Sequence, residues 1–100
     1  MRLKQRDIDA IKAAAFEAFG ETAVVKLFGS RTRDDLRGGD IDLLIEADPT
    51  GESEPHRVWA FKNALFNRID EQKVDVVVVE RGRAASAFAR LVSPDAVPLP

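Results

Sequence analysis

Three aspartates in this 100-residue chain have a spacing that suits a metal-binding cluster of acids. Asp40 and Asp42 stand at alternate positions of the sequence DIDLLIE. In a β-strand, alternate side chains point to the same face and lie about 6 to 7 Å apart. Carboxylate oxygens are hard ligands that suit magnesium or manganese. Asp75 is the one interior charge of the valine-rich residues 74–80, and if this stretch pairs with the strand that carries Asp40, the three carboxylates converge.

Each acid also has an ordinary structural interpretation. Charged residues often alternate on the solvent face of a strand, so Asp40 and Asp42 alone do not specify a metal site. A buried and unpaired Asp75 would be strongly destabilising and would need a compensating cation. Alternatively, Asp75 lies at a strand end in water, or in an ion pair with an arginine or lysine. The sequence leaves both arrangements open.

A glycine–serine pair precedes the aspartates, at the end of the β-branched and apolar residues 22–28. Gly29 would let the backbone approach a phosphate closely, and the N–H groups that follow, with the Ser30 hydroxyl, could donate hydrogen bonds to phosphate oxygens. Arg31 and Arg33 come next and could neutralise a triphosphate or a departing pyrophosphate. They could equally be solvated loop arginines, and a glycine–serine turn alone is an ordinary turn.

The hydropathy pattern predicts helices around these segments. Apolar residues recur at helical spacing over residues 7–19, with Asp7 placed as an N-cap and Gly20 as a C-terminal stop. A second helix is predicted over residues 55–71, because proline suits the first helical position and apolar residues follow at helical spacing. Residues 84–92 form a third, shorter helical pattern.

Three strands complete the prediction: residues 22–28, 40–46 and 74–80. The last has valine on both faces, which favours a central, buried strand. We therefore expect an α/β (α+β) domain, in which helices pack on a small mixed sheet of at least three strands. Residues 1–92 form this single domain, and the proline-containing residues 93–100 form an extended C-terminal tail.

The aromatic residues of the second helix and the single histidine are expected to be structural. Trp59, Phe61 and Phe66 follow helical spacing and are predicted to lie in the core, although an exposed Trp59 would suit a partner interface. His56 is expected at the surface, and a metal site built from several histidines is excluded because the chain has one histidine.

Composition narrows the function classes. With 45% hydrophobic residues, 32% charged residues and a net charge of −2, the chain matches a soluble globular domain. It has no cysteine, which excludes disulfides, thiolate metal sites and thiol nucleophiles. No apolar stretch matches a secretion signal or a membrane span, and a cytoplasmic location is favoured. The 15 basic and 17 acidic residues argue against sequence-independent binding of nucleic acid.

The motifs G-S-R-T-R at 29–33, D-I-D-L at 40–43 and V-D-V at 74–76 together resemble the nucleotidyltransferase superfamily that includes DNA polymerase β, and more closely its minimal (MNT) branch. The resemblance covers residues 23–79 and implies the polymerase β-like fold. It also implies two magnesium ions, with manganese as a substitute, and ATP as the substrate. The residues that it assigns to catalysis and metal binding are Asp40, Asp42 and Asp75, and those that it assigns to nucleotide binding are Gly29, Ser30, Arg31 and Arg33.

The resemblance further implies a partner and a reaction. Minimal members are commonly encoded with a helical HEPN toxin, and some transfer AMP from ATP to a tyrosine of that toxin. We therefore expect a magnesium-dependent adenylyltransferase that AMPylates a protein hydroxyl and acts as an antitoxin, without binding nucleic acid or membranes; a homo-oligomer is compatible with the sequence. Two alternatives stay open: a small-molecule, aminoglycoside-like nucleotidyltransferase that needs a partner subunit, and a non-catalytic antitoxin that acts by contact.

Overall fold

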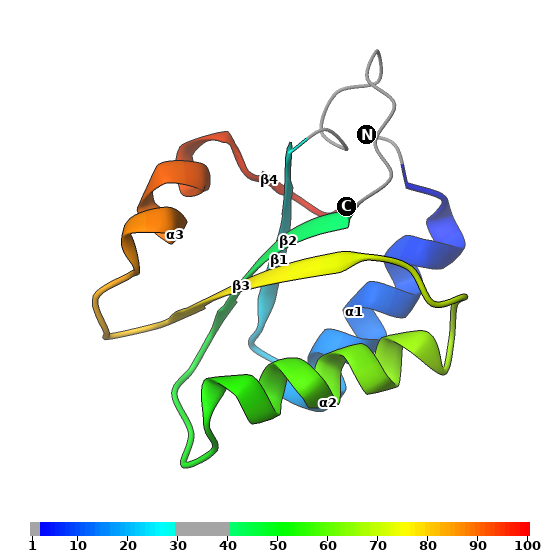
Figure 1. The fold of residues 1–100 in the computed structure, drawn as a ribbon, viewed down its shortest axis with the longest axis horizontal. Coiled ribbons are helices and arrows are strands. Elements are labelled where there is room, and N and C mark those ends of the chain that lie inside the picture. The colour runs from blue at the N-terminus through cyan, green and yellow to red at the C-terminus, as the bar shows by residue number, and fades with distance from the viewer. Residues whose placement is uncertain (1–2, 30–40) are drawn as a thin grey trace.

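The computed structural model describes residues 3–29 and 41–100, which form a four-stranded sheet with helices on both faces (Figure 1). Helices α1 and α2 lie on one side of the sheet and α3 lies on the other. The predicted α+β class, a small mixed sheet with helices packed on it, is confirmed. In chain order the elements are α1 (Gln5–Phe19), β1 (Val24–Phe28), β2 (Ile41–Ala47), α2 (Glu54–Phe66), β3 (Val74–Glu80), α3 (Ala87–Val92), the 3₁₀ turn η2 (Ser93–Asp95) and β4 (Val97–Pro98).

The strands run in the spatial order β3-β2-β1-β4. Strand β1 pairs antiparallel with β2 and with β4, whereas β2 and β3 are parallel. A parallel pair needs a long crossover connection, and α2 supplies it between β2 and β3. Because β2 and β3 run in the same direction, the first residues of both strands lie at the same end of the sheet.

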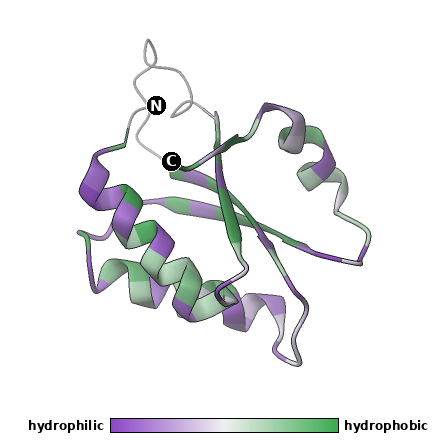
Figure 2. Cartoon of the chain, turned by 180° about the vertical axis from the view of Figure 1, so that it is seen from behind, coloured by the Kyte–Doolittle hydropathy of each residue, from purple (hydrophilic) through white to green (hydrophobic). Residues whose placement is uncertain are grey.

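Strand β2 contributes to a core on each face of the sheet. Ile41, Leu43 and Ile45 are fully buried in the larger core against α1 and α2, as the alternating pattern of the sequence predicts. Leu44 points the other way and is fully buried in a smaller core with Phe28 and the α3 residue Ala89. Helices α1 and α2 alternate between hydrophilic and hydrophobic residues along their length (Figure 2), as helices with one buried face do.

The ends of the helices differ from the prediction. Helix α1 begins at Gln5 with Lys4 as its N-cap, so Asp7 lies within the first turn and is not the N-cap. Gly20 ends this helix as predicted, with a φ of 96°. Helix α2 ends at Phe66 and not near residue 71, because the Arg68 N–H donates to the Leu65 carbonyl at 2.9 Å and tightens the last turn. Helix α3 begins at Ala87, after the cap residue Ser86, and is therefore shorter than predicted.

Strand β3 lies at an edge of the sheet, and the prediction of a central strand is wrong. Its interior valines are half-buried. Val76 and Val78 pack against the larger core, whereas Val77 and Val79 pack against the smaller core beside α3. Valine on both faces of β3 therefore reflects the helices that cover both faces of the sheet, and it carries no information on the order of the strands.

The C-terminal residues 93–100 contain η2 and β4, which adds a fourth strand to the sheet. Val97 and Pro98 pair with β1, and the Leu99 N–H donates to the Val25 carbonyl at 3.1 Å. Leu99 is buried in the larger core. None of the helices in the described part of the chain is both long and apolar enough to cross a membrane.

Candidate functional site

Asp42 and Asp75 are direct neighbours in the sheet. The parallel register of β2 and β3 pairs them, one residue after the pair formed by Ile41 and Val74. Register partners on neighbouring strands point to the same face, and their backbones lie about 4.8 Å apart. The two carboxylates therefore share one face of the sheet at the end where both strands begin. This is the convergence that the sequence alone left conditional on the pairing of these strands.

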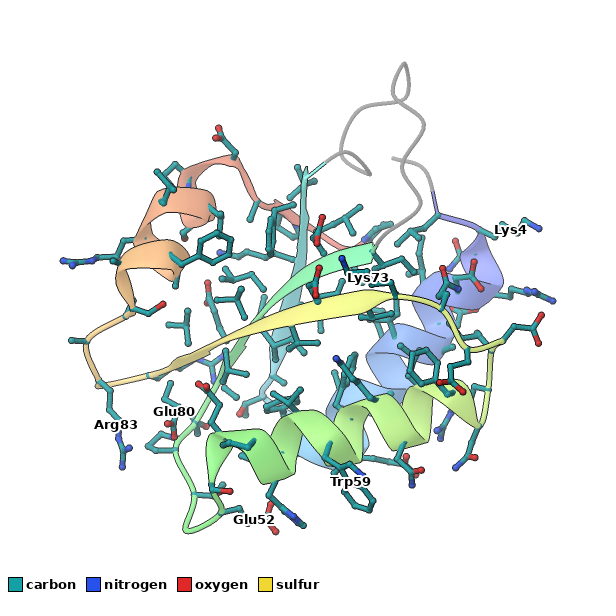
Figure 3. The ribbon with its side chains drawn as sticks, in the orientation of Figure 1. Lys4, Glu52, Trp59, Lys73, Glu80 and Arg83 are labelled. Atoms are coloured by element: carbon teal, nitrogen blue, oxygen red, sulfur yellow. The ribbon has the colours of Figure 1, made fainter. Side chains whose placement is uncertain are left out.

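The two carboxylates differ in exposure. Asp42 is half-buried, whereas Asp75 is exposed as the second residue of an edge strand. Of the two arrangements considered for Asp75, the structure has the exposed one, so the desolvation argument for a compensating cation does not apply to it. Lys73 lies at the same end of the sheet (Figure 3). Asp42 and Asp75 place two acidic side chains opposite each other on neighbouring strands, where like charges repel.

Gly29 completes this end of the sheet. It follows β1 directly, and the preceding residue, Phe28, is the register partner of Asp42. Its φ of +79° lies in the left-handed region, which favours glycine. A Cβ atom at this position would meet the Asp42 carboxylate oxygen Oδ2. The backbone at Gly29 therefore approaches the Asp42 carboxylate more closely than any other residue type would allow.

The structure thus brings together three of the predicted site residues, namely Gly29, Asp42 and Asp75. The other four, Ser30, Arg31, Arg33 and Asp40, lie outside the described residues. Within residues 3–29 and 41–100, no three Asp, Glu or His side chains are grouped so that they could hold a metal ion. The predicted cluster has its third acid, Asp40, beyond those ranges.

The donor set at this end of the sheet fits a divalent magnesium or manganese ion. Both described side chains offer carboxylate oxygens, and magnesium is commonly bound by one or two carboxylates together with phosphates and water. Asp75 is open to solvent, and the Asp42 carboxylate lies against the backbone at Gly29. One of the two carboxylates is therefore accessible to a cation from solvent.

An aromatic pair lies next to the acids, and no sequence motif indicated it. Phe28 is buried on the same face as Asp42, and the ring of Phe88 meets it edge-on, with the centroids 6.1 Å apart. Phe88 comes from α3 and is 53% exposed. The available signal in the sequence was the position of Phe28 immediately before the glycine–serine pair. The sequence around Phe88 did not indicate that Phe88 would contact Phe28.

The acids at the opposite end of the sheet are paired with bases. Lys26 and Glu46 form an ion pair at 2.7 Å across β1 and β2. The Thr22 hydroxyl donates to Asp48 at 2.8 Å and Arg81 donates to it at 3.1 Å, and these two hydrogen bonds hold the pKa of Asp48 below its usual value. These pairs are structural contacts between loops and strands.

Trp59 and His56 lie on the outer surface of α2. Trp59 is 62% exposed, so the prediction that it belongs to the core is wrong; Phe61 is fully buried and Phe66 is half-buried. His56 is exposed, as predicted, and its ring stacks on Trp59 with the centroids 5.9 Å apart. Shallow hollows flank Trp59 on two sides, one toward Glu17 and the other toward Glu71.

Comparison of the chain with protein-family models gives no match, and comparison with curated proteins gives none either.

Proposed function

We propose that this chain is a magnesium-dependent nucleotidyltransferase that transfers AMP from ATP to a protein hydroxyl. The observation that carries the proposal is the pairing of Asp42 with Asp75 on neighbouring parallel strands. Gly29 supports it, because the first residue of the glycine–serine pair lies against the same carboxylate. The motifs of the sequence place the remaining groups, Ser30 and Asp40, in the chain segment between β1 and β2.

Asp42, Asp75 and, from its place in the sequence, Asp40 would hold the metal ions. When bound, two magnesium ions would neutralise charge on the reacting phosphates and on the attacking and leaving oxygens. The backbone N–H groups that follow Gly29 in the sequence, with the Ser30 hydroxyl, would donate hydrogen bonds to the phosphates of ATP. Arg31 and Arg33 would neutralise the triphosphate and the pyrophosphate that leaves.

The proposed transfer is a substitution at the α-phosphorus of ATP. The acceptor oxygen forms a bond to that phosphorus, the bond from phosphorus to the bridging oxygen of the β-phosphate breaks, and pyrophosphate leaves. The proton of the acceptor hydroxyl passes to the Asp75 carboxylate and from there to water. The exposure of Asp75 suits this role, because a carboxylate in contact with solvent can release the proton.

The position of Asp75 also favours a macromolecular acceptor. This carboxylate is exposed on the α3 face of the sheet, so a hydroxyl on the surface of another protein can approach it. We propose a tyrosine of a helical, HEPN-type toxin as the acceptor, which would make the chain an antitoxin. This part of the proposal rests on the sequence resemblance.

One observation favours a second candidate, an antitoxin that acts by contact alone. Exposed tryptophans are frequent centres of protein interfaces, and Trp59 is both exposed and flanked by hollows on two sides. In this case the acids would not be needed for neutralisation of the partner.

The decisive experiment is transfer of label from α-labelled ATP to proteins in a lysate of the source cells, in the presence of magnesium. Asp42→Asn and Asp75→Asn should each reduce labelling by about 100-fold or more, because each removes a charged ligand without changing the size of the side chain. Glu52→Gln is the matched control, since this exposed acid lies in the loop between β2 and α2 (Figure 3), and it should label normally.

Two results would contradict transferase activity. One is labelling that persists unchanged in Asp42→Asn, and the other is no labelling with any of the four nucleotides in magnesium or manganese. Protection of cells by Asp42→Asn, with loss of protection in Trp59→Ala, would instead support the contact antitoxin.

A further inference from the structure

The outer edge of β3 forms one border of the described sheet. Strand β3 ends the sheet, and no described strand pairs with its outer side. In Figure 1 it crosses in front of β2 and β1. A groove of about 390 Å³ runs along it, lined by consecutive residues from Val76 to Glu80 and, on the α3 side, by Arg83, Ala85 and Phe88. Long apolar edge strands template pairing with another strand, and natural proteins usually protect them.

The hydrogen bonds of β3 show which of its backbone groups face this groove. The Lys73 carbonyl accepts from the Ile41 N–H at 3.1 Å, and the Arg81 N–H donates to the Ala47 carbonyl at 2.9 Å. Backbone groups alternate in direction along a strand, so the odd-numbered residues of β3 bond to β2. The N–H and C=O groups of Val74, Val76 and Val78 therefore point outward.

We infer that a second copy of this chain occupies the groove and pairs its β3 antiparallel to the first, about a two-fold axis at Val77. In an antiparallel hydrogen-bonded pair, the backbone N–H and C=O groups of both residues must point toward the partner strand. This register joins Val76 to Val78 of the second copy and Val78 to Val76 of the second copy. The two sheets then form one continuous sheet, and the assembly closes because the interface is isologous.

Strand length and backbone direction select this register, because Val77 is the central residue of Val74–Glu80 and an axis there pairs the whole strand. With the axis at Val77, Asp75 lies opposite Val79 of the second copy and Glu80 lies opposite Val74 of the second copy. A shift by one residue in either direction would oppose outward groups to inward ones, and in one direction it would also place Asp75 opposite Glu80, where like charges repel. The Glu80 carbonyl accepts from the Arg83 N–H at 3.2 Å, so the Val76 and Val78 pairs form the centre of the contact.

The inference is independent of the proposed function. It rests on the position of β3 at the edge of the described sheet, the direction of its backbone groups and the length of the strand. Pairing would also bury Phe88, which is 53% exposed and lines the groove on the α3 side.

Single-cysteine variants test the register, because the chain has no cysteine of its own. Val77→Cys should form a disulfide-linked dimer on mild oxidation. The axis places this residue opposite its own copy in a non-hydrogen-bonded pair with Cα atoms about 4.5 Å apart, within the range that a disulfide spans. Val79→Cys is the matched control on the same face and should remain uncrosslinked, since its neighbour would be Asp75. Equal crosslinking of the two variants, or of neither, overturns the inference.

Amide hydrogen exchange of the unaltered protein gives a second test that needs no variant. Sedimentation should give twice the chain mass of 11.0 kDa. In the dimer, the amides of Val76 and Val78 should be protected, and their exchange should become faster on dilution. The amides of Val77 and Val79, which bond to β2, should stay protected at every concentration and serve as internal controls. A monomer, or a dimer in which the amides of Val76 and Val78 exchange freely, overturns the inference.

Discussion

Gly29 and Asp42 lie so close together that a side chain at residue 29 would collide with the Asp42 carboxylate. Gly29 also has a φ of +79°, which an L-residue with a side chain adopts at a cost of about 1 to 2 kcal/mol. Two separate requirements therefore select glycine at this position: the backbone conformation and the space beside the carboxylate. Gly82 allows the two requirements to be tested separately. It has a similar positive φ, but no atom lies close to the position that a Cβ atom would take.

We predict that Gly29→Ala destabilises the protein more than Gly82→Ala does. Gly82 has a φ of +83°, and a Cβ atom added there would meet open space, so alanine should cost about 1 kcal/mol through backbone conformation alone. Alanine at residue 29 should cost about 1 kcal/mol more, because it displaces the Asp42 carboxylate. Urea denaturation measures both variants.

The same pair of variants reports on activity. If the proposed function is correct, Gly29→Ala should reduce AMP transfer by about 100-fold, because a shift of about 1 Å at a reacting group has an effect of this size. Gly82→Ala should retain transfer. Equal losses of stability and of transfer in the two variants would contradict the role of the close contact with Asp42.

Arg57 is the buried charge of the described core, and we predict that its removal is strongly destabilising. Its guanidinium lies 4.8 Å from the centroid of the Phe19 ring and 3.8 Å from Glu80 at the closest N–O pair. Arg57→Ala should lower the free energy of unfolding by about 3 kcal/mol, because it leaves the Glu80 carboxylate without this partner and opens a cavity.

Arg57→Met is the informative comparison. The atoms Nε and Nη1 of Arg57 are buried without a hydrogen-bond partner, so a methionine of similar length removes an unfavourable group while it keeps the volume. The loss of stability should be less than half that of Arg57→Ala, and Glu80→Gln in the methionine background should recover part of it. Equal losses for alanine and methionine in urea denaturation would show that the ion pair, and not the packing, dominates.

Two aromatic residues of α2, two positions apart, should differ sharply in their contribution to stability. Phe61 is fully buried and its ring centroid lies 6.0 Å from that of Phe19. Phe61→Ala should cost about 3 to 4 kcal/mol. Trp59→Ala should change the free energy of unfolding by less than about 1 kcal/mol, because the side chain is mostly in solvent. A large loss in Trp59→Ala, measured by thermal or urea denaturation, would contradict its surface position.

The contacts of Asp48 predict a pH dependence of stability. Hydrogen bonds from Thr22 and Arg81 lower the pKa of Asp48 below its ordinary value of 3.8. A carboxylate with a lowered pKa stabilises the folded state above its unfolded pKa, and this contribution is lost as the pH falls through the folded pKa. Asp48→Asn should therefore lower the melting temperature at pH 7, and the difference from the unaltered protein should shrink below pH 3.8.

Asp95→Asn, a substitution of an exposed aspartate in η2, is the control for this experiment. It should leave the melting temperature nearly unchanged at both pH values. A difference between Asp48→Asn and the unaltered protein that stayed constant from neutral pH to well below pH 3.8 would contradict the stabilising role of the ionised carboxylate.

Local sequence patterns predicted most of the secondary structure and the position of Asp42 and Asp75 within it. Alternation in the stretch around Asp42 fixes which residues face the core, because side chains in a strand alternate whatever the strand pairs with. Gly20 and Gly29 likewise mark an end and a turn through their own backbone freedom, which depends on nothing distant in the chain. The helix ends were less predictable, since the apolar spacing continues to Ile69 after α2 has ended.

The tertiary structure decided how these elements combine. Only the parallel register of β2 and β3 makes Asp42 and Asp75 neighbours, although all of α2 lies between them in the sequence. The edge position of β3 and the exposure of Trp59 were equally absent from the local pattern. The physical reason is the same for all three: a residue's conformation responds to neighbours within about one helical turn, whereas strand order and burial depend on which distant surfaces cover it.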